Sequence, residues 1–306
     1  MTLDDLIGPA AVAALDGGLA TELEAAGHDL SDDLWSARLL RDDPGAIEAV
    51  HLAYFRAGAR VAITASYQAS EEGFAHVGVG AAEARRLLRR SVELALTARE
   101  RHVAETGVEG LLVAASVGPY GAMLADGQEY TGAYGVGRDV LLGFHRRRLA
   151  ELAAAGPDVL AIETIPSAPE ADVLVELLAE HPDVPAWIAF SCADGSRTCE
   201  GQPIEEAVEI ATRSPQVVAV GVNCTRPEHV AELLQRAATA TDRPLVAYPN
   251  NGRVWDGANR CWLGVGAEGF AVAEVDRWRA AGARLIGGCC GVGPAGIRHL
   301  AAGLAA

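Results

Sequence analysis

The most informative absence in this chain of 306 residues is lysine. The chain contains 25 arginines and no lysine. Schiff-base aldolases and pyridoxal-phosphate enzymes both need a lysine amine, so the sequence excludes both kinds of chemistry. A P-loop nucleotide site is excluded too, because that loop uses a lysine to hold phosphate.

The chain also lacks a long hydrophobic segment. Half of its residues are hydrophobic, but no apolar run is long enough to span a bilayer. The N-terminus carries Asp4 and Asp5, and Gly8, Pro9 and Asp16 interrupt its apolar run, so it does not resemble a signal peptide. We therefore expect a cytoplasmic protein that has no membrane partner.

Basic patches are missing as well, and the formal net charge is −16. Without a basic surface to displace counterions, a nucleic-acid partner is not expected. The acidity mildly favours a cationic small-molecule substrate, although it also serves simply to keep a protein in solution. No feature of the sequence predicts an oligomeric state.

Short apolar runs alternate with helical patterns along the chain. The predicted strands are Val12–Leu15, Val61–Thr64, Leu111–Ser116, Val159–Glu163, Ala186–Phe190, Val217–Val222, Leu245–Tyr248 and Arg284–Ile286. The predicted helices are Pro44–Gly58, Ala81–Glu105, Pro169–Glu180, Pro203–Thr212, Pro227–Ala238 and Glu268–Ala281. This alternation predicts an α/β fold, a (β/α)8 TIM barrel that forms a single domain over residues 1–306.

A doubly wound open sheet is the competing fold. No Gly-x-Gly-x-x-Gly follows the first predicted strand, so a dinucleotide site of that kind lacks support. Polar residues follow the apolar run at the same end of every predicted strand, as expected for the rim of an active site. The segment Gly118–Gly137 is too long for a simple connection and is predicted to be an active-site loop.

Three of the six cysteines stand at predicted strand ends: Cys224, Cys289 and Cys290. Adjacent cysteines seldom bridge each other, because the ring strains the peptide between them, but both can turn toward one soft cation. If the two strand ends meet, three thiolates converge and leave one position open, as in a catalytic zinc site. The alternatives are three independent buried cysteines or a redox-active vicinal disulfide.

The remaining cysteines, Cys192, Cys199 and Cys261, are expected to be small buried hydrophobic residues. A chain without secretory features is expected to keep all six thiols reduced.

Asp16 and Glu163 are single carboxylates at the ends of apolar strands. A buried carboxylate needs hydrogen bonds or a cation, and a substrate ammonium group would serve. Each could equally cap a helix or pair with an arginine. Gly17 and Gly18 follow Asp16, and their amides can bind a carboxylate as an anion nest, although such glycines more often just make a turn.

Aromatic residues also occur in the segments that follow the strands: Trp35, Tyr67, Tyr120, Tyr130, Tyr134 and Tyr248. Aromatic faces attract sulfonium and quaternary ammonium groups, but most aromatic residues pack in a core or anchor a loop.

Taken together, these segments resemble the homocysteine S-methyltransferase family over essentially the whole chain. The matching stretches are 15–24, 34–38, 64–70, 118–122, 129–132, 163–167, 221–224, 248–250 and the terminal Gly-Gly-Cys-Cys-Gly at 287–291. The branch it resembles uses S-methylmethionine or S-adenosylmethionine rather than betaine.

The resemblance implies a (β/α)8 barrel with zinc on Cys224, Cys289 and Cys290. It places homocysteine on Asp16, Gly17, Gly18 and Glu163, and we include Asn223, which precedes Cys224 in the matching stretch, among the candidate substrate-binding residues. Zinc would lower the pKa of the homocysteine thiol, and the thiolate would attack the methyl carbon of a sulfonium donor.

The chain departs from the family pattern at two places. Asn251-Gly252-Arg253 stands where members often carry Ser-Gly-Glu, which puts a positive charge near a pocket expected to bind a cation. Val292 stands where threonine is common. Two other functions remain open: a barrel that takes the methyl group from a corrinoid protein or from betaine, and a zinc- or thiol-binding protein without turnover.

Overall fold

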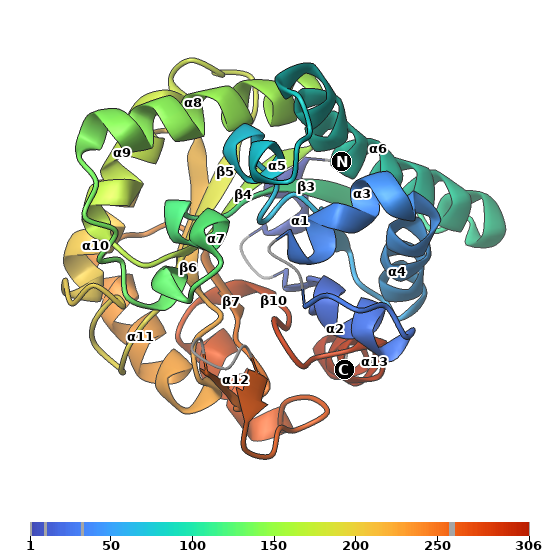
Figure 1. The fold of residues 1–306 in the computed structure, drawn as a ribbon. Coiled ribbons are helices and arrows are strands. Elements are labelled where there is room, and N and C mark those ends of the chain that lie inside the picture. Colours follow the sequence, from blue (N-terminus) through green and yellow to red (C-terminus); the bar gives the residue numbers. More distant parts are fainter. Residues whose placement is uncertain (1, 9–10, 32–33, 257–260, 306) are drawn as a thin grey trace.

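The computed structural model describes residues 2–8, 11–31, 34–256 and 261–305, and in it eight parallel strands form a barrel surrounded by helices (Figure 1). The strands are β1 (Ala13–Ala14), β2 (Val61–Ile63), β3 (Leu112–Val117), β4 (Val159–Ile165), β5 (Ala186–Phe190), β6 (Val217–Asn223), β7 (Leu245–Tyr248) and β10 (Ala283–Ile286). Their order in the sheet is β1-β10-β7-β6-β5-β4-β3-β2. A parallel bridge between Leu15 and Val61 joins the two ends of this order and closes the barrel.

All eight predicted strands are confirmed, and so is the single-domain (β/α)8 fold. Their bounds differ from the predicted ones by at most one residue at either end, except at β4, which ends two residues later than predicted. β4 extends to Ile165 and β6 to Asn223, so Glu163 lies within a strand rather than at its end. The expected polar rim therefore begins inside the barrel.

The six predicted helices are also present. They correspond to α4 (Pro44–Arg56), α6 (Ala81–Thr106), α9 (Ala168–Leu178), α10 (Ile204–Ala211), α11 (Pro227–Ala240) and α12 (Val272–Ala280). The last was predicted to start at Glu268 but begins only at Val272, where the Glu274 side chain accepts the Ala271 amide at 2.9 Å and caps the helix. Across the described ranges, no helix combines the length and apolar content needed to cross a bilayer.

Several elements were not predicted. They are α1 (Leu3–Leu6), α2 (Leu19–Ala25), η1 (Trp35–Arg38), α3 (Leu39–Asp42), α5 (Glu71–His76), α7 (Tyr120–Leu124), η2 (Gln128–Tyr130), α8 (Arg138–Ala154), α13 (Pro294–Leu304) and the antiparallel pair β8 (Val254–Asp256) and β9 (Cys261–Leu263). In α8 the buried face contains His145 and Arg148, so the apolar periodicity that marks a helix is broken. The long segment after β3 is a loop with two short helices, α7 and η2, inside it.

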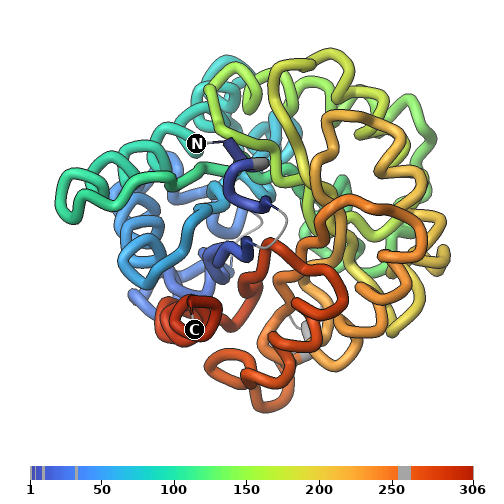
Figure 2. The backbone as a smooth tube through the Cα atoms, turned by 180° about the vertical axis from the view of Figure 1, so that it is seen from behind, coloured from blue at the N-terminus to red at the C-terminus, as the bar shows by residue number. Residues whose placement is uncertain are grey.

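Side chains fill the barrel in the manner of a packed core. Along β3, Leu112 and Ala114 pack inside the barrel, whereas Val113 and Ala115 pack outward against the helices. The N-terminal segment contributes Leu3, Leu6 and Ile7 to the inner cluster. Figure 2 shows this segment, in dark blue, lying across the back of the barrel. The opposite end is therefore the one that remains available for a site.

Candidate active site

A cavity of about 510 Å³ opens at the carboxyl ends of the strands. Its walls come from the segments that follow β1, β2, β3, β6, β7 and β10 and from the carboxyl end of β4 itself, so residues distant in the sequence meet there. This is the end of a (β/α)8 barrel where reactive groups gather. The size lies in the range of small-molecule sites.

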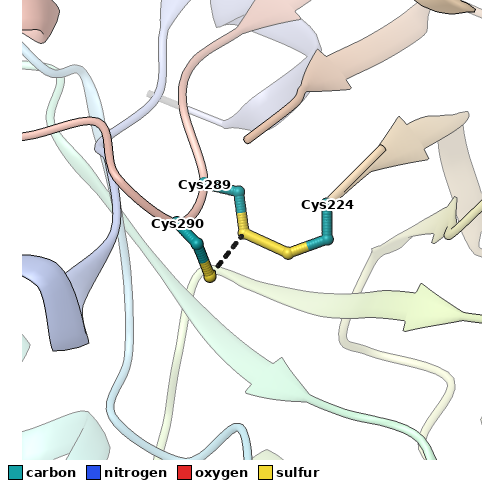
Figure 3. Close-up of side chains that lie close together, drawn as sticks. All are labelled: Cys224, Cys289 and Cys290. Atoms are coloured by element: carbon teal, nitrogen blue, oxygen red, sulfur yellow. Dashed lines mark hydrogen bonds between the residues drawn. A yellow bond between two sulfur atoms is a disulfide. The ribbon is translucent and has the colours of Figure 1, made fainter. Parts of the chain in front are cut away.

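The three thiols predicted to converge do so at one wall of this cavity (Figure 3). Cys224 follows β6, and Cys289 and Cys290 follow β10, with β7 between those strands in the sheet. All three sulfur atoms lie within 4.8 Å of one another, and the sulfurs of Cys289 and Cys290 are 3.9 Å apart. The alternative of three independent cysteines is therefore wrong.

The expectation that all six thiols are reduced is also wrong for one pair. Cys224 and Cys289 form a disulfide, with their Cα atoms 5.6 Å apart. That separation lies within the range that a disulfide can bridge, although β7 lies between the two strands that lead to these residues. The adjacent pair Cys289 and Cys290 is not bridged, as ring strain predicts.

The other cysteines stand apart from this cluster. Cys192 is buried, as expected, while Cys199 is only partly buried. The side chain of Cys261 lies outside the described part of the chain. None of these thiols takes part in the cluster within that part.

The cluster fits a soft metal ion once its disulfide is reduced. Three thiolates around a tetrahedral zinc ion at about 2.3 Å would stand about 3.8 Å from one another. The sulfurs of Cys289 and Cys290 are already 3.9 Å apart. Burial, reinforced by nearby carboxylates, raises the pKa of the Cys290 thiol to about 12. A bound cation is what would allow the thiolate to form at neutral pH.

Glu163 lies on the cavity wall, and two hydroxyl groups form hydrogen bonds with its carboxylate. The Ser116 hydroxyl donates to its Oε1 atom, and Tyr248 also hydrogen-bonds to this carboxylate. Burial outweighs these bonds and raises the pKa of Glu163 to about 7. The carboxylate is thus oriented for a ligand, while no ion pair with another described residue neutralises its negative charge.

Asp16 lies beside this group but deeper in the barrel. Its Oδ2 atom accepts the Ile63 amide at 2.7 Å, while Oδ1 is buried and has no hydrogen-bond partner among the described residues. Burial, with a contribution from Glu163, raises the pKa of Asp16 well above its usual value. Asp16 is 1% exposed and does not line the cavity.

Gly17 and Gly18 both line the cavity, but the Gly18 amide is already engaged. It donates to the Val292 carbonyl at 3.0 Å, and the Tyr54 hydroxyl donates to that same carbonyl at 3.1 Å. A Cβ atom at Gly17 would stand 2.2 Å from the Val292 oxygen, so no other residue fits there. In this turn the backbone lies so close to the carbonyls of Val292 and Cys289 that a side chain at either position would clash, which is a structural reason for both glycines.

Asn223 does not line the cavity and acts on the strand that carries Glu163. Its Oδ1 atom accepts the Thr164 amide at 2.7 Å, and its Nδ2 atom donates to the Thr164 hydroxyl at 2.8 Å. Thr164 has a φ of 57°, and the pairing of β4 with β5 shifts register between Ile162 and Ile165. Asn223 therefore stabilises the bulge that contains Glu163.

Backbone strain is concentrated at the cavity. Among the described residues, the non-glycine positions with positive φ are Trp35, Ala125, Thr164 and Cys224, and all four line it. Left-handed backbone is costly for a side-chain-bearing residue, most of all for β-branched Thr164. Such outliers gather at functional sites because the surrounding fold must hold them in place.

The aromatic candidates divide into two groups. Trp35, Tyr67, Tyr130 and Tyr248 line the cavity, whereas Tyr120 and Tyr134 do not. Tyr120 and Tyr134 pack together, with ring centroids 5.5 Å apart, and help to anchor the loop after β3.

Buried Arg148 on α8 ties the loops together and was missed from the sequence. Its guanidinium donates to the carbonyls of Gly118, Ser66 and Tyr67 at 2.9, 3.1 and 2.9 Å. It thus joins the loop after β2 to the end of β3 under the cavity wall.

Four residues of the cavity with a carboxylate or guanidinium side chain also received no role from the sequence: Glu24, Asp29, Glu129 and Arg253. Glu24 and Glu129 lie in stretches that match the family pattern, and Arg253 is the departure noted above. The signal was present, but a lone charged residue in a loop does not indicate which way its side chain points.

A family model and a curated relative both match this chain over nearly its whole length. A family model described as homocysteine S-methyltransferase matches residues 13–304. A protein of Escherichia coli (strain K12) named Homocysteine S-methyltransferase is 47% identical over 290 residues, which cover 94% of this chain and 94% of that protein.

Two crystal structures of the homocysteine methyltransferase MmuM from Escherichia coli share the fold. The metallated form aligns with a TM-score of 0.89 at 44% identity, covering 98% of this chain and 99% of that one. The oxidized form aligns with a TM-score of 0.89 at 45% identity, covering 98% of each.

Proposed function

This chain belongs to the homocysteine S-methyltransferase family, and from that premise we propose that it transfers a methyl group from a sulfonium donor to the thiol of L-homocysteine, giving methionine. The donor class is S-methylmethionine or S-adenosylmethionine. The observation that carries the proposal is the meeting of Cys224, Cys289 and Cys290 at the wall of a substrate-sized cavity.

The reduced thiols of Cys224, Cys289 and Cys290 would hold a zinc ion. Zinc bound there supplies an open coordination position that lowers the pKa of a substrate thiol. The chain's own contribution is to bring the three sulfurs together from two strand ends at the cavity wall.

Glu163 and Asp16 would hold the homocysteine ammonium group. Glu163 faces the cavity with a carboxylate fixed by Ser116. Asp16 lies behind it and has a buried oxygen without a partner in the described part of the chain. The Gly17–Gly18 turn would approach the substrate carboxylate, and Asn223 would act through Thr164 rather than by contact.

In the transfer step the homocysteine thiolate attacks the methyl carbon in line. The new carbon–sulfur bond forms as the donor's carbon–sulfur bond breaks, and that electron pair stays on the donor sulfur, which becomes a neutral thioether. The thiol proton would pass to solvent when homocysteine binds, so no general base is needed during transfer. Alignment of the two sulfurs would contribute about 7–11 kcal/mol of barrier lowering.

The experiment is a donor panel with homocysteine and reduced, zinc-loaded protein, with methionine as the readout. We expect methionine from a sulfonium donor and none from betaine. Methionine formed only when a methylated corrinoid protein is added would replace this donor class with the corrinoid alternative. Zinc binding without any methionine would make the protein a binding protein.

A further inference from the structure

The short segment that follows β7 lies between the two parts of the thiol cluster. In the sheet, β7 separates β6, which leads to Cys224, from β10, which leads to Cys289 and Cys290. Two strands on either side of a third strand stand about 9–10 Å apart. The Cα atoms of Cys224 and Cys289 are nevertheless 5.6 Å apart. The two chains therefore converge beyond the end of β7, and contacts in the fold must hold them there.

The backbone at the end of β7 bonds to both cysteine segments. The Tyr248 carbonyl accepts the Cys224 amide at 3.2 Å. The next carbonyl, that of Pro249, accepts the Cys289 amide at 2.8 Å. Since neighbouring strands bond to opposite edges of the strand between them, one extended segment sets the height of both cysteines.

Asn251 then makes two bonds to the turn that carries the cysteine pair. Its backbone amide donates to the Cys290 carbonyl at 3.0 Å, and its Nδ2 atom donates to the Gly291 carbonyl at 3.2 Å. Its Oδ1 atom accepts the Arg253 amide at 3.3 Å. Asn251 is 8% exposed and is not among the residues that line the described cavity, so its side chain acts on the protein and not on a ligand.

The amide group of Asn251 is packed between two glycine backbones. A Cβ atom at Gly291 would stand 2.2 Å from Asn251 Cγ, and one at Gly266 would stand 2.0 Å from Asn251 Nδ2. Gly291 also has a φ of 82°, which favours glycine. Both glycines thus leave room for the amide, and the close contacts on either side fix its position.

Side chains from two sides hold the backbone of Gly291. The hydroxyl of Thr21, on α2, accepts the Gly291 amide at 2.8 Å, while Asn251 donates to the Gly291 carbonyl. These bonds restrain the chain directly after Cys290. Ligands that are already in place lose less conformational freedom when an ion binds, so partners outside the ligand set contribute to metal affinity.

Given the zinc assignment of the proposed function, on which this inference rests, we propose that Asn251 is a positioning residue of the metal site. It holds the Cys289–Cys290 turn where three thiols can share one ion. Asn251 is part of the departure from the family pattern noted in the sequence. In the serine that is common there, the hydroxyl would stand in the place of Cγ and would not reach Gly291.

The zinc affinity of the reduced protein, measured by competition with a chromophoric chelator, tests this role. Asn251→Ala should raise the dissociation constant for zinc about 10-fold, because one buried hydrogen bond beside the ligands is lost. An unchanged dissociation constant would overturn the inference.

Asn250→Ala is the matched control, because it removes the same side chain from the neighbouring buried position. Asn250 is 5% exposed, and its Oδ1 atom accepts the Gly252 amide at 3.0 Å, a bond within its own loop. Zinc affinity should remain that of the unaltered chain. An equal loss of affinity in Asn250→Ala would attribute the effect to the loop as a whole and contradict a specific role for Asn251.

Asn251→Ser separates the two ends of the side chain. A serine hydroxyl can still accept the Arg253 amide, as in a serine turn, but it does not replace the donor to the Gly291 carbonyl. This variant should bind zinc as weakly as Asn251→Ala. Full recovery of zinc affinity would assign the effect to the bond within the loop and overturn the proposed contact.

The Cys224–Cys289 disulfide gives a second readout that needs neither metal nor turnover. In a dithiothreitol redox buffer, the two protein thiols form the disulfide while cyclic oxidised dithiothreitol is reduced to its dithiol. The equilibrium constant of this exchange reports how closely the fold holds the two cysteines. It should fall about 10-fold in Asn251→Ala, which makes the reduction potential about 30 mV less negative, and it should be unchanged in Asn250→Ala.

An exchange constant that Asn251→Ala leaves unaltered would also overturn the inference. The outcome is separate from that of the methionine assay. If the unaltered chain binds no zinc or forms no methionine, the proposed function fails, and the disulfide equilibrium still decides whether Asn251 holds the cysteine turn.

Discussion

The two ends of the barrel are built from the same strands and have opposite character. At the amino end, Leu3, Leu6 and Ile7 pack under the inner core and carry no charge into it. At the carboxyl end stand three thiols, buried Asp16 and Glu163, and four residues with left-handed backbone. One end supplies stability, and the other contains features that cost stability, among them buried carboxylates whose charge a cationic ligand would neutralise.

The strongest test of this contrast is removal of one thiol. Cys290→Ser should lose bound zinc and reduce methyl transfer by more than about 100-fold, because even changes beside a metal ligand cost 10- to 100-fold. Metal analysis and a methionine assay measure both effects. Cys199→Ser is the control, because Cys199 is a free, partly buried cysteine outside the cluster. A Cys290→Ser protein with normal zinc and turnover would refute the metal assignment.

Glu163→Gln should weaken homocysteine binding without removing the zinc ion. Loss of the charge should raise the KM for homocysteine about 10- to 100-fold while zinc stays bound. Zinc content and KM are measured on the same preparation. A variant that has lost its zinc but keeps an unchanged KM for homocysteine would contradict the assignment of Glu163 to substrate binding.

The same variant should stabilise the reduced, metal-free protein at alkaline pH. Burial raises the pKa of Glu163 to about 7, above its usual 4.5. The stability linked to this group is therefore present below about pH 4.5 and lost as the pH rises through 7. At pH 8 the glutamine should gain up to about 3 kcal/mol in the free energy of unfolding, and at pH 5 much less. Denaturant unfolding at both pH values measures this, and an equal gain at both would contradict the assignment.

Asn223→Ala tests a smaller effect. Without its two bonds to Thr164, the bulge in β4 should relax, and Glu163 should lose its orientation. We expect kcat/KM for homocysteine to fall about 5- to 10-fold, the value of one or two neutral hydrogen bonds. Asn223→Asp keeps the acceptor for the Thr164 amide and should recover part of the loss, whereas no recovery would favour a direct contact with substrate.

Leu6→Ala should leave the chemistry untouched. A leucine truncated in a packed core costs about 2–5 kcal/mol of stability. Because Leu6 lies at the end of the barrel remote from the thiols, kcat/KM for homocysteine should be unchanged at a temperature where the variant is folded. A large loss of kcat/KM in the folded variant would show that the two ends are coupled.

The sequence was most informative where one strong pattern decides the structure. Alternation of apolar runs with helices predicted all eight strands, and the glycine-flanked cysteine pair predicted the thiol cluster. Helix α8 was missed because His145 and Arg148 occupy its buried face, and these polar residues interrupt the repeat of apolar residues by which a helix is recognised in a sequence. Their partners, Glu170 and the carbonyls of the loops, are contacts that only the fold creates.

The finer features of the site were beyond the sequence for the same reason. Asn223 stands next to Cys224 in the chain, which suggested contact with substrate, but its amide is turned to Thr164 on the other side of β5. The bond between Cys224 and Cys289 depends on the meeting of two strand ends, which residue spacing does not give.

The central claim is that Cys224, Cys289 and Cys290 hold one zinc ion with a position open to the substrate sulfur. Zinc K-edge X-ray absorption on reduced, zinc-loaded protein tests it most directly. We predict three sulfur neighbours at about 2.3 Å without substrate and four when homocysteine is added. Fewer than three sulfur neighbours, or a count that homocysteine leaves unchanged, would contradict the account.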